Sequence, residues 1–254
     1  MDYEFIEIKN HAGWAEIILN RPKKMNALRP EMCEEIAHAG EHLASQSDIR
    51  AIVIRPNGKH FSAGFDVATE MAPTDTKGTW VANRKMQDAF RRINELPVVT
   101  ICEMRGYVVG AGLLLAAVCN LRYAEPEAIF YVPELDMGIP FSLGGVATVA
   151  RYIGITRTAD LVLNCVKITA SDVAMTDFVT KILPEAELTA HVDATASRLA
   201  ARPQSLILSS IATLREAERA LMPSPASDLF TMLYVDREEE AKSVRDAYSK
   251  RFKS

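Results

Sequence analysis

The stretch RGYVVGAGLL at residues 105–114 decides the fold, because it joins a glycine-rich turn to an apolar helix. Gly106, Gly110 and Gly112 allow backbone conformations and close contacts that other residues resist. The apolar run that continues to Val118 predicts a buried helix. The first N–H groups of a helix lack internal partners and attract an anion or a developing oxyanion. A close-packed helix with glycines at tight crossings gives the same pattern, so the stretch alone leaves both interpretations open.

Short apolar strands and helices alternate on both sides of this stretch. Strands are predicted at Tyr3–Ile8, Trp14–Leu19, Ala51–Ile54, Pro97–Cys102, Leu121–Ala124 and Ile129–Val132. Helices are predicted after Pro30, over Thr79–Glu95 and from Gly144 through Tyr152. Such alternation is typical of an α/β architecture. From Leu188 onward the pattern is helical, so we divide the chain into a core, residues 1–188, and a helical C-terminal region, residues 189–254.

The composition excludes several classes of protein. The 254 residues are 48% hydrophobic and 24% charged, with a formal net charge of −4, which is ordinary for a soluble globular protein. No strongly basic stretch indicates nucleic acid as a partner. The longest apolar stretch, residues 107–118, is too short to cross a bilayer. The four cysteines form no C-x-x-C pair, so we expect neither a metal site nor a redox motif, and we expect a reducing, cytoplasmic location.

Two further segments carry residues suited to chemistry. Phe61–Asp66, with the sequence FSAGFD, holds Gly64 in a loop that can direct the N–H of Ala63 into a pocket. Glu134 lies among apolar neighbours directly after a predicted strand. A carboxylate in such surroundings has a raised pKa, which suits a general base. Taken singly, each segment also fits an ordinary turn.

In this order and spacing the segments resemble the crotonase family, which comprises enoyl-CoA hydratases and isomerases. The resemblance covers nearly the whole chain and rests on Arg21-Pro22, Asn26-Ala27-Leu28, Phe61–Asp66, Gly106–Gly112, Cys119–Ala124 and Pro133–Ile139. It implies a β/α spiral fold with a helical C-terminal region, and assembly as a homotrimer or homohexamer. It also implies an acyl-CoA thioester as the substrate, with no separate cofactor and no metal.

The resemblance assigns roles to individual residues. Ala63 and Ala111 correspond to the two backbone donors of the oxyanion hole, and Glu134 to a catalytic acid/base. The groove that binds coenzyme A is expected along four loop residues, Gly64, Asp66, Val67 and Gly110. Lys23 and Lys24 are expected to meet the nucleotide phosphates. An ordinary solvated loop is an equal interpretation for the two lysines.

One departure from the family pattern is informative. Hydratases of the family use two glutamates around one water, and Leu114 occupies the position of the first. One glutamate suffices for an isomerase that moves a double bond from the 3- to the 2-position, so we expect Δ3,Δ2-enoyl-CoA isomerase activity, with Leu114 as an apolar wall of the pocket. If residues 134–136 are extended, Asp136 points to the same side as Glu134 and could supply the second carboxylate. A hydratase or another enolate-forming enzyme using Asp136 therefore stays open, as does a non-catalytic acyl-CoA-binding protein.

An apolar stripe in the C-terminal region bears on assembly. Leu229, Phe230, Leu233 and Tyr234 share one face of a predicted helix. Core packing explains most of such a stripe, and an exposed remainder would suit an oligomer contact.

Overall fold

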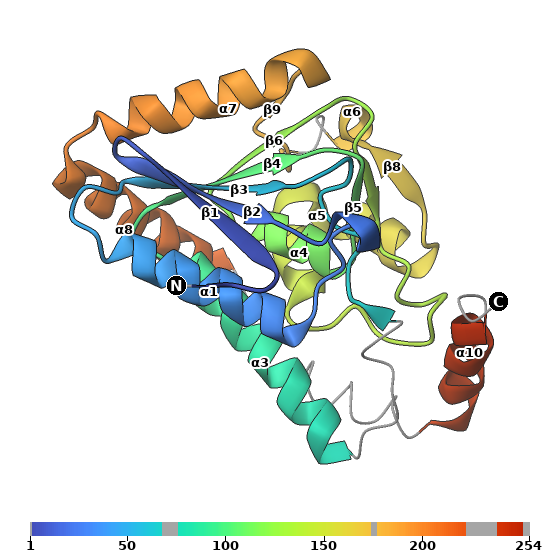
Figure 1. Ribbon diagram of the computed structural model, residues 1–254. Helices are drawn as coiled ribbons and strands as arrows, with labels where there is room; N and C mark the ends of the chain where they lie inside the picture. Colours follow the sequence, from blue (N-terminus) through green and yellow to red (C-terminus); the bar gives the residue numbers. More distant parts are fainter. Residues whose placement is uncertain (1, 68–75, 174–176, 222–237, 251–254) are drawn as a thin grey trace.

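The computed structural model describes residues 2–67, 76–173, 177–221 and 238–250 (Figure 1). Its main sheet has six strands in the order β1-β2-β3-β4-β6-β9. These are β1 (Ile6–His11), β2 (Trp14–Leu19), β3 (Ala51–Pro56), β4 (Val99–Met104), β6 (Leu121–Ala124) and β9 (Lys181–Ile182). Strands β1 and β2 form an antiparallel hairpin, and every later pairing is parallel. The central strands are buried on both faces, as expected from their apolar, β-branched residues.

A second sheet holds three short strands in the order β5-β7-β8. Strand β5 (Tyr107–Val109) pairs in parallel with β7 (Ile129–Tyr131), and β7 pairs antiparallel with β8 (Lys167–Thr169). The turn at Arg105 and Gly106 leads the chain from β4 of the first sheet directly into β5 of the second. The glycine-rich stretch 105–114 therefore crosses from one sheet to the other and ends in the helix α4 (Ala111–Ala117).

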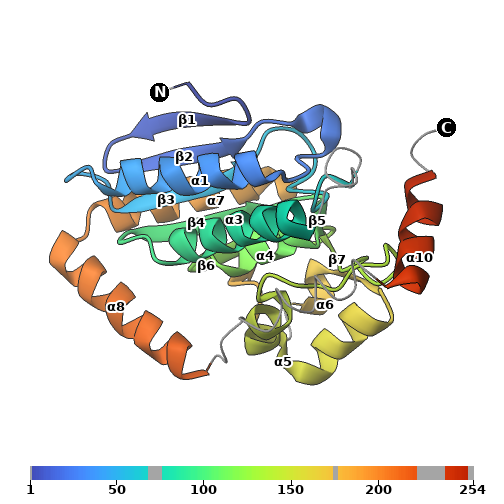
Figure 2. The same ribbon diagram turned by 90° about the horizontal axis from the view of Figure 1, so that it is seen from below.

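Helices cover both faces of the main sheet (Figure 2). On one face α1 (Pro30–Ala44) and α3 (Thr76–Asn94) pack against side chains such as Ile52 and Ile54, and α4 completes the same apolar cluster. The alternate residues Ala51 and Val53 face α7 (Glu185–Ala200) on the other side. The two-residue period of a strand thus divides the core into two clusters. The remaining helices are η1 (Pro22–Lys24), α5 (Gly145–Leu163), α6 (Ala170–Val173), α8 (Gln204–Leu221) and α10 (Glu239–Lys250).

The observed α7 corrects the predicted boundary between residues 188 and 189. The helix begins at Glu185, directly after Pro184, so the boundary falls inside it. Leu188, Val192 and Ala196 are fully buried against the sheet, which makes α7 a layer of the core. A separate helical C-terminal region therefore begins only after α7. Helix α5 consists of two helical segments that meet at Gly154, whose φ of 74° and ψ of 159° are not helical, so the first segment ends close to the predicted end at Tyr152.

Assembly as a homotrimer or homohexamer stays a prediction. The stripe from Leu229 to Tyr234 lies outside the described residues. On the described helix α8, however, Leu206 and Leu214 expose 62% and 58% of their surface, which is costly for a free helix face. We expect multi-angle light scattering at micromolar concentration to report three or six copies. A monomer would contradict the prediction.

Among the described helices, none combines the length and the apolar character that a membrane crossing requires.

Candidate active site

Parallel backbone pairing brings the three segments singled out in the sequence side by side. The N–H of Ser62 donates to the Tyr107 carbonyl at 2.9 Å, and the N–H of Val109 donates to the Ser62 carbonyl at 3.0 Å. On the other edge of β5, the N–H of Gly110 donates to the Tyr131 carbonyl at 2.9 Å. The loop 61–66, the start of α4 and the turn after β7 therefore meet at one end of the small sheet.

Glu134 lies directly over the start of α4. Residues Pro133–Gly138 form a turn after β7, and the Glu134 side chain is buried, with 8% of its surface exposed. A Cβ added to Gly110 would lie 2.3 Å from Oε1 of Glu134, so a side chain there would force this carboxylate to move. Gly110 also has a φ of 48°, a conformation that other residues rarely adopt. The nearby Glu134 carboxylate and the positive φ together explain why glycine occupies position 110.

Burial sets the electrostatics of Glu134. Removal from water raises the pKa of this carboxyl group to about 8, and a hydrogen bond from its own backbone works weakly in the opposite direction. Its Oε2 has no hydrogen-bond partner within the described part of the chain. Three other carboxylates are buried among the described residues, and each is held by arginine: Glu16 by Arg55, Glu103 by Arg55 and Arg105, and Asp66 by Arg21. Of these four buried carboxylates, Glu134 is the one without a cationic partner in the described part of the chain, which is the arrangement expected for a group that exchanges protons.

The raised pKa of Glu134 predicts a pH-dependent gain in stability for Glu134→Gln. The pKa is about 8 in the folded chain against an ordinary 4.5, so folding keeps a proton that the unfolded chain releases as pH rises between these values. The wild type therefore loses stability across this window, whereas a glutamine does not titrate. Relative to wild type, the variant should gain about 3–5 kcal/mol in unfolding free energy between pH 4.5 and pH 8.5. Urea unfolding at several pH values measures this change, and the exposed Asp136→Asn serves as the control. A pH-independent difference between wild type and Glu134→Gln would show that Glu134 titrates normally.

Backbone N–H groups beside Glu134 provide the candidate oxyanion hole. Ala111 is the first residue of α4, and its N–H finds no acceptor among the described residues. The assignment of Ala63 as the first donor is wrong, because its N–H already donates to the Met25 carbonyl at 2.8 Å. Two residues further on, the N–H of Phe65 has no acceptor in the described part of the chain. The structure thus offers Phe65 and Ala111, in place of Ala63 and Ala111, as the pair of free donors.

A buried asparagine fixes the loop that carries Phe65. Asn26 is completely buried, and its side-chain amide donates to the carbonyls of Asn57 and His60 at 3.0 and 2.8 Å. Its own carbonyl accepts the Ser62 hydroxyl at 2.8 Å, and that hydroxyl oxygen in turn accepts the Gly64 N–H at 3.1 Å. These bonds lock the loop 21–28 onto the loop 57–64. No role for Asn26 is predicted from the sequence, where its signal is its place in the Asn26-Ala27-Leu28 motif of the resemblance.

The other residues assigned to the coenzyme A groove occupy different environments. Asp66 is 3% exposed and forms an ion pair with Arg21 at 2.8 Å, so its carboxylate is engaged in holding the loops together. Gly64 has a φ of 87° and packs against the Val109 carbonyl, where a Cβ would approach to 2.8 Å. Val67 is half-buried directly after this loop. Lys23 and Lys24 are exposed on η1, the first turn of the loop that is locked onto residues 57–64.

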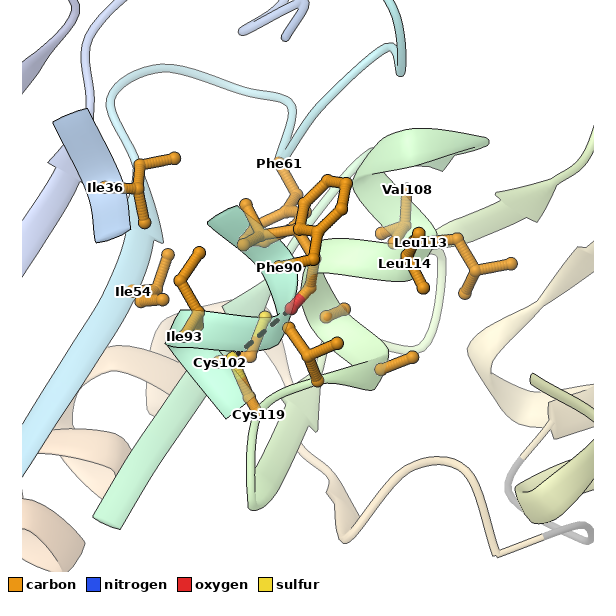
Figure 3. Close-up of a cluster of buried hydrophobic side chains, with 14 of the residues drawn as sticks. Ile36, Ile54, Phe61, Phe90, Ile93, Cys102, Val108, Leu113, Leu114 and Cys119 are labelled. Atoms are coloured by element: carbon orange, nitrogen blue, oxygen red, sulfur yellow. Dashed lines mark hydrogen bonds between the residues drawn. The ribbon is translucent and has the colours of Figure 1, made fainter. Parts of the chain in front are cut away.

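The structure separates the two residues assigned to the substrate pocket. Leu114 is 1% exposed and belongs to the apolar cluster that also contains Phe61 and Phe90 (Figure 3). Asp136 is exposed and accepts the Tyr131 hydroxyl at 3.2 Å. The premise that residues 134–136 are extended is wrong, because the N–H of Met137 donates back to the Glu134 carbonyl at 3.1 Å and closes a turn. Asp136 consequently points to solvent while Glu134 points inward, which removes the geometric reason for a second carboxylate at this position.

Comparison with known proteins identifies the family of this site. The enoyl-CoA hydratase/isomerase profile matches residues 9–252. The chain belongs to the enoyl-CoA hydratase/isomerase family. Within this family it is 31% identical over 202 residues to a probable enoyl-CoA hydratase of Mycobacterium bovis, covering 78% of this chain and 76% of the relative. It is 29% identical over 164 residues to the mitochondrial Δ(3,5)-Δ(2,4)-dienoyl-CoA isomerase of mouse, covering 60% of this chain and 50% of that protein.

Solved structures of the hydratase/isomerase family share the fold. An enoyl-CoA hydratase from Bacillus halodurans superimposes with a TM-score of 0.87, covering 96% of this chain and 100% of that one at 20% identity. The expected crotonase spiral is therefore confirmed, and the chain is an enzyme of a family that processes acyl-CoA thioesters. The relatives' names include hydratases and isomerases, so the comparisons establish the family and leave the reaction to the chemistry of the site.

Proposed function

We propose that this protein is a Δ3,Δ2-enoyl-CoA isomerase with Glu134 as its single acid/base. The observation that carries the proposal is a carboxylate that is buried with no arginine or lysine to pair with it in the described part of the chain. Among the described residues Glu134 is buried without an ion-pair partner, Leu114 fills the position of the first family glutamate, and Asp136 turns away toward Tyr131. Hydration has to hold a water, deprotonate it and protonate C2, which requires two groups. Migration of a double bond moves one proton, which one carboxylate accomplishes.

The proposed reaction moves one proton between two carbons. The thioester oxygen of a 3-enoyl-CoA accepts hydrogen bonds from the N–H groups of Phe65 and Ala111. Glu134 removes a proton from C2, and the electron pair of the C–H bond delocalises into a dienolate whose oxygen those donors stabilise. The protonated Glu134 then delivers the proton to C4, which leaves the double bond between C2 and C3 and regenerates the carboxylate. Apolar surroundings such as Leu114 keep water away from the intermediate.

Coenzyme A is proposed to bind beside the loop that carries Phe65. Lys23 and Lys24 are exposed on η1, and the loop they begin is bonded to residues 57–64 through Asn26 and Met25. The two lysines therefore stand near the donors of the proposed oxyanion hole, in a position to contact the negatively charged phosphates of coenzyme A. The proposal needs no metal. Among the described residues, no group of three His, Cys, Asp or Glu side chains is placed to hold one.

Hydration of a 2-enoyl-CoA is the second candidate, favoured by the names of relatives such as the Mycobacterium bovis protein. One assay decides between the two candidates. Purified protein is incubated with a 3-enoyl-CoA and, separately, with the matching 2-enoyl-CoA, and the products are separated by chromatography. The proposal predicts efficient conversion of the first substrate and little 3-hydroxyacyl-CoA from the second. Efficient hydration would overturn the isomerase assignment, and turnover of neither substrate would favour a non-catalytic acyl-CoA-binding protein.

A further inference from the structure

The C-terminal helix α10 rests directly on the turn that carries Glu134. Gly138, in this turn, has a φ of 70° and no side chain to separate its backbone from the helix. A Cβ added at Gly138 would lie 2.6 Å from the Ala241 carbonyl oxygen and 3.1 Å from Cγ of Arg245. The Arg245 guanidinium donates to the Gly138 carbonyl at 3.0 Å. The backbones of α10 and of the turn therefore meet at Gly138, and the Arg245 guanidinium forms a hydrogen bond to the turn at this contact.

Hydrogen bonds within the turn connect Gly138 to Glu134. The Glu134 carbonyl accepts the N–H groups of Met137 and Ile139 at 3.1 and 3.0 Å. The N–H of Gly138 donates to the Leu135 carbonyl at 3.1 Å. Displacement of the Gly138 carbonyl would therefore disturb the bonds that set the backbone direction at Glu134. The side chain that lies over Gly110 depends on this direction.

One face of α10 makes these contacts, and the rest of the helix is polar and exposed. Ala241, Arg245 and Tyr248 follow the spacing of a single helical face and are half-buried, whereas Lys242, Ser243 and Val244 are exposed. The helix has a defined start, because the Glu238 carboxylate accepts the N–H groups of Ala241 and Glu240 at 2.7 and 3.2 Å. The contact at Gly138 joins this polar helix to the turn.

We propose that α10 clamps the Glu134 turn and that Arg245 is the positioning residue of this clamp. Arg245 touches no reacting atom in this arrangement. It acts by holding the Gly138 carbonyl, which keeps the turn closed and the Glu134 carboxylate buried over Gly110. Only the predicted effect of the clamp on turnover rests on the proposed function. The structural part of the claim concerns the turn itself and is measured without substrate.

Arg245→Met tests the clamp, with Lys242→Met as the matched control. Met keeps the aliphatic part of either side chain and removes its charge, and Lys242 is an exposed residue of the same helix that forms an ion pair with Glu239. In Arg245→Met we expect hydrogen–deuterium exchange of the Met137 and Ile139 amides to accelerate about fivefold, the factor that corresponds to one lost hydrogen bond. NMR of ¹³C-labelled glutamate carboxyl groups, with the Glu134 signal assigned by its loss in Glu134→Gln, should show the pKa of Glu134 about one unit lower as water enters.

Turnover provides a third readout of the clamp. We expect kcat of Arg245→Met to fall about tenfold while KM changes little, because a misplaced acid/base slows the chemical step more than it weakens binding. Arg245→Lys should restore part of the loss, since an ammonium group also donates to a carbonyl. Unchanged exchange or an unchanged Glu134 titration in Arg245→Met would overturn the clamp whatever reaction the enzyme performs. Equal effects in Lys242→Met would overturn it as well, because they would come from α10 in general.

Discussion

Replacing Glu134 by glutamine is expected to lower kcat for isomerisation at least about 10²-fold, the low end for removing a general base. Glutamine has nearly the same shape, so binding of the acyl-CoA should change much less than turnover. The physical reason is that no other described carboxylate at the site is free to take the proton. Steady-state kinetics with a 3-enoyl-CoA, together with the dissociation constant of a non-reacting acyl-CoA, separate the two effects.

Asp136→Asn is the control for this substitution. Asp136 is exposed and bonded to the Tyr131 hydroxyl, which burial and the nearby Asp136 carboxylate give a pKa raised to about 12. Loss of this surface contact should leave most of the activity in place. A collapse of activity in Asp136→Asn that matches the loss in Glu134→Gln would reject the single-carboxylate mechanism and support a two-carboxylate hydratase.

Ala111→Pro is expected to lower kcat by about 10²–10³-fold, the loss typical of deleting one oxyanion-hole donor. Proline removes the N–H that would bind the thioester oxygen. The first position of a helix tolerates proline well, because this N–H has no partner within the helix. The preceding Gly110, with φ 48° and ψ −116°, is already in a conformation that a residue with a side chain would resist. The substitution therefore removes a donor with little cost to α4.

Ala111→Gly keeps the N–H and separates the donor from the side chain. It should retain activity close to that of the wild type, and circular dichroism should show that both variants are folded. If folded Ala111→Pro turned over substrate at the wild-type rate, the oxyanion would have to lie elsewhere. A similar loss in both variants would show that the Ala111 methyl group, and not its N–H, matters.

The fold could be predicted from the sequence because its signals are local. Alternating apolar strands and helices gave the α/β class, and the glycines at 106, 110 and 112 marked the passage into α4. The start of α7 was placed three residues late, although Pro184 marks it. The packing of α7 against the sheet could not be predicted, because the sequence of a moderately apolar helix does not indicate which surface the helix contacts.

Features of the site that depend on one segment could be predicted from the sequence. Features that depend on hydrogen bonds between distant segments could not. Burial of Glu134 follows from its apolar neighbours. The choice between Ala63 and Phe65 as donor depends on a hydrogen bond from Ala63 to Met25, a partner nearly forty residues earlier, and no local pattern reveals it. The alternative role of Asp136 depended on an extended segment, and the structure has a turn there. Gly138 was the available signal, since a glycine with positive φ commonly ends such a turn.

The contact between α10 and Gly138 had no signal in the sequence at all. Ala241, Arg245 and Tyr248 do not form an apolar stripe, so the helix pattern does not single out a contact face. A hydrogen bond from a guanidinium to a backbone carbonyl more than a hundred residues earlier requires the folded chain to become visible.

The transfer of label between two carbons tests the central claim most directly, that one buried carboxylate carries the proton. A 3-enoyl-CoA with both hydrogens at C2 replaced by deuterium is converted in ordinary water, and mass spectrometry of the isolated 2-enoyl-CoA locates the label. Because Glu134 is buried and returns the proton it removes, the account predicts deuterium at C4 in a clearly measurable fraction of the first product molecules. Product without deuterium at C4, accompanied by 3-hydroxyacyl-CoA, would contradict the account and show that water and a second group take part.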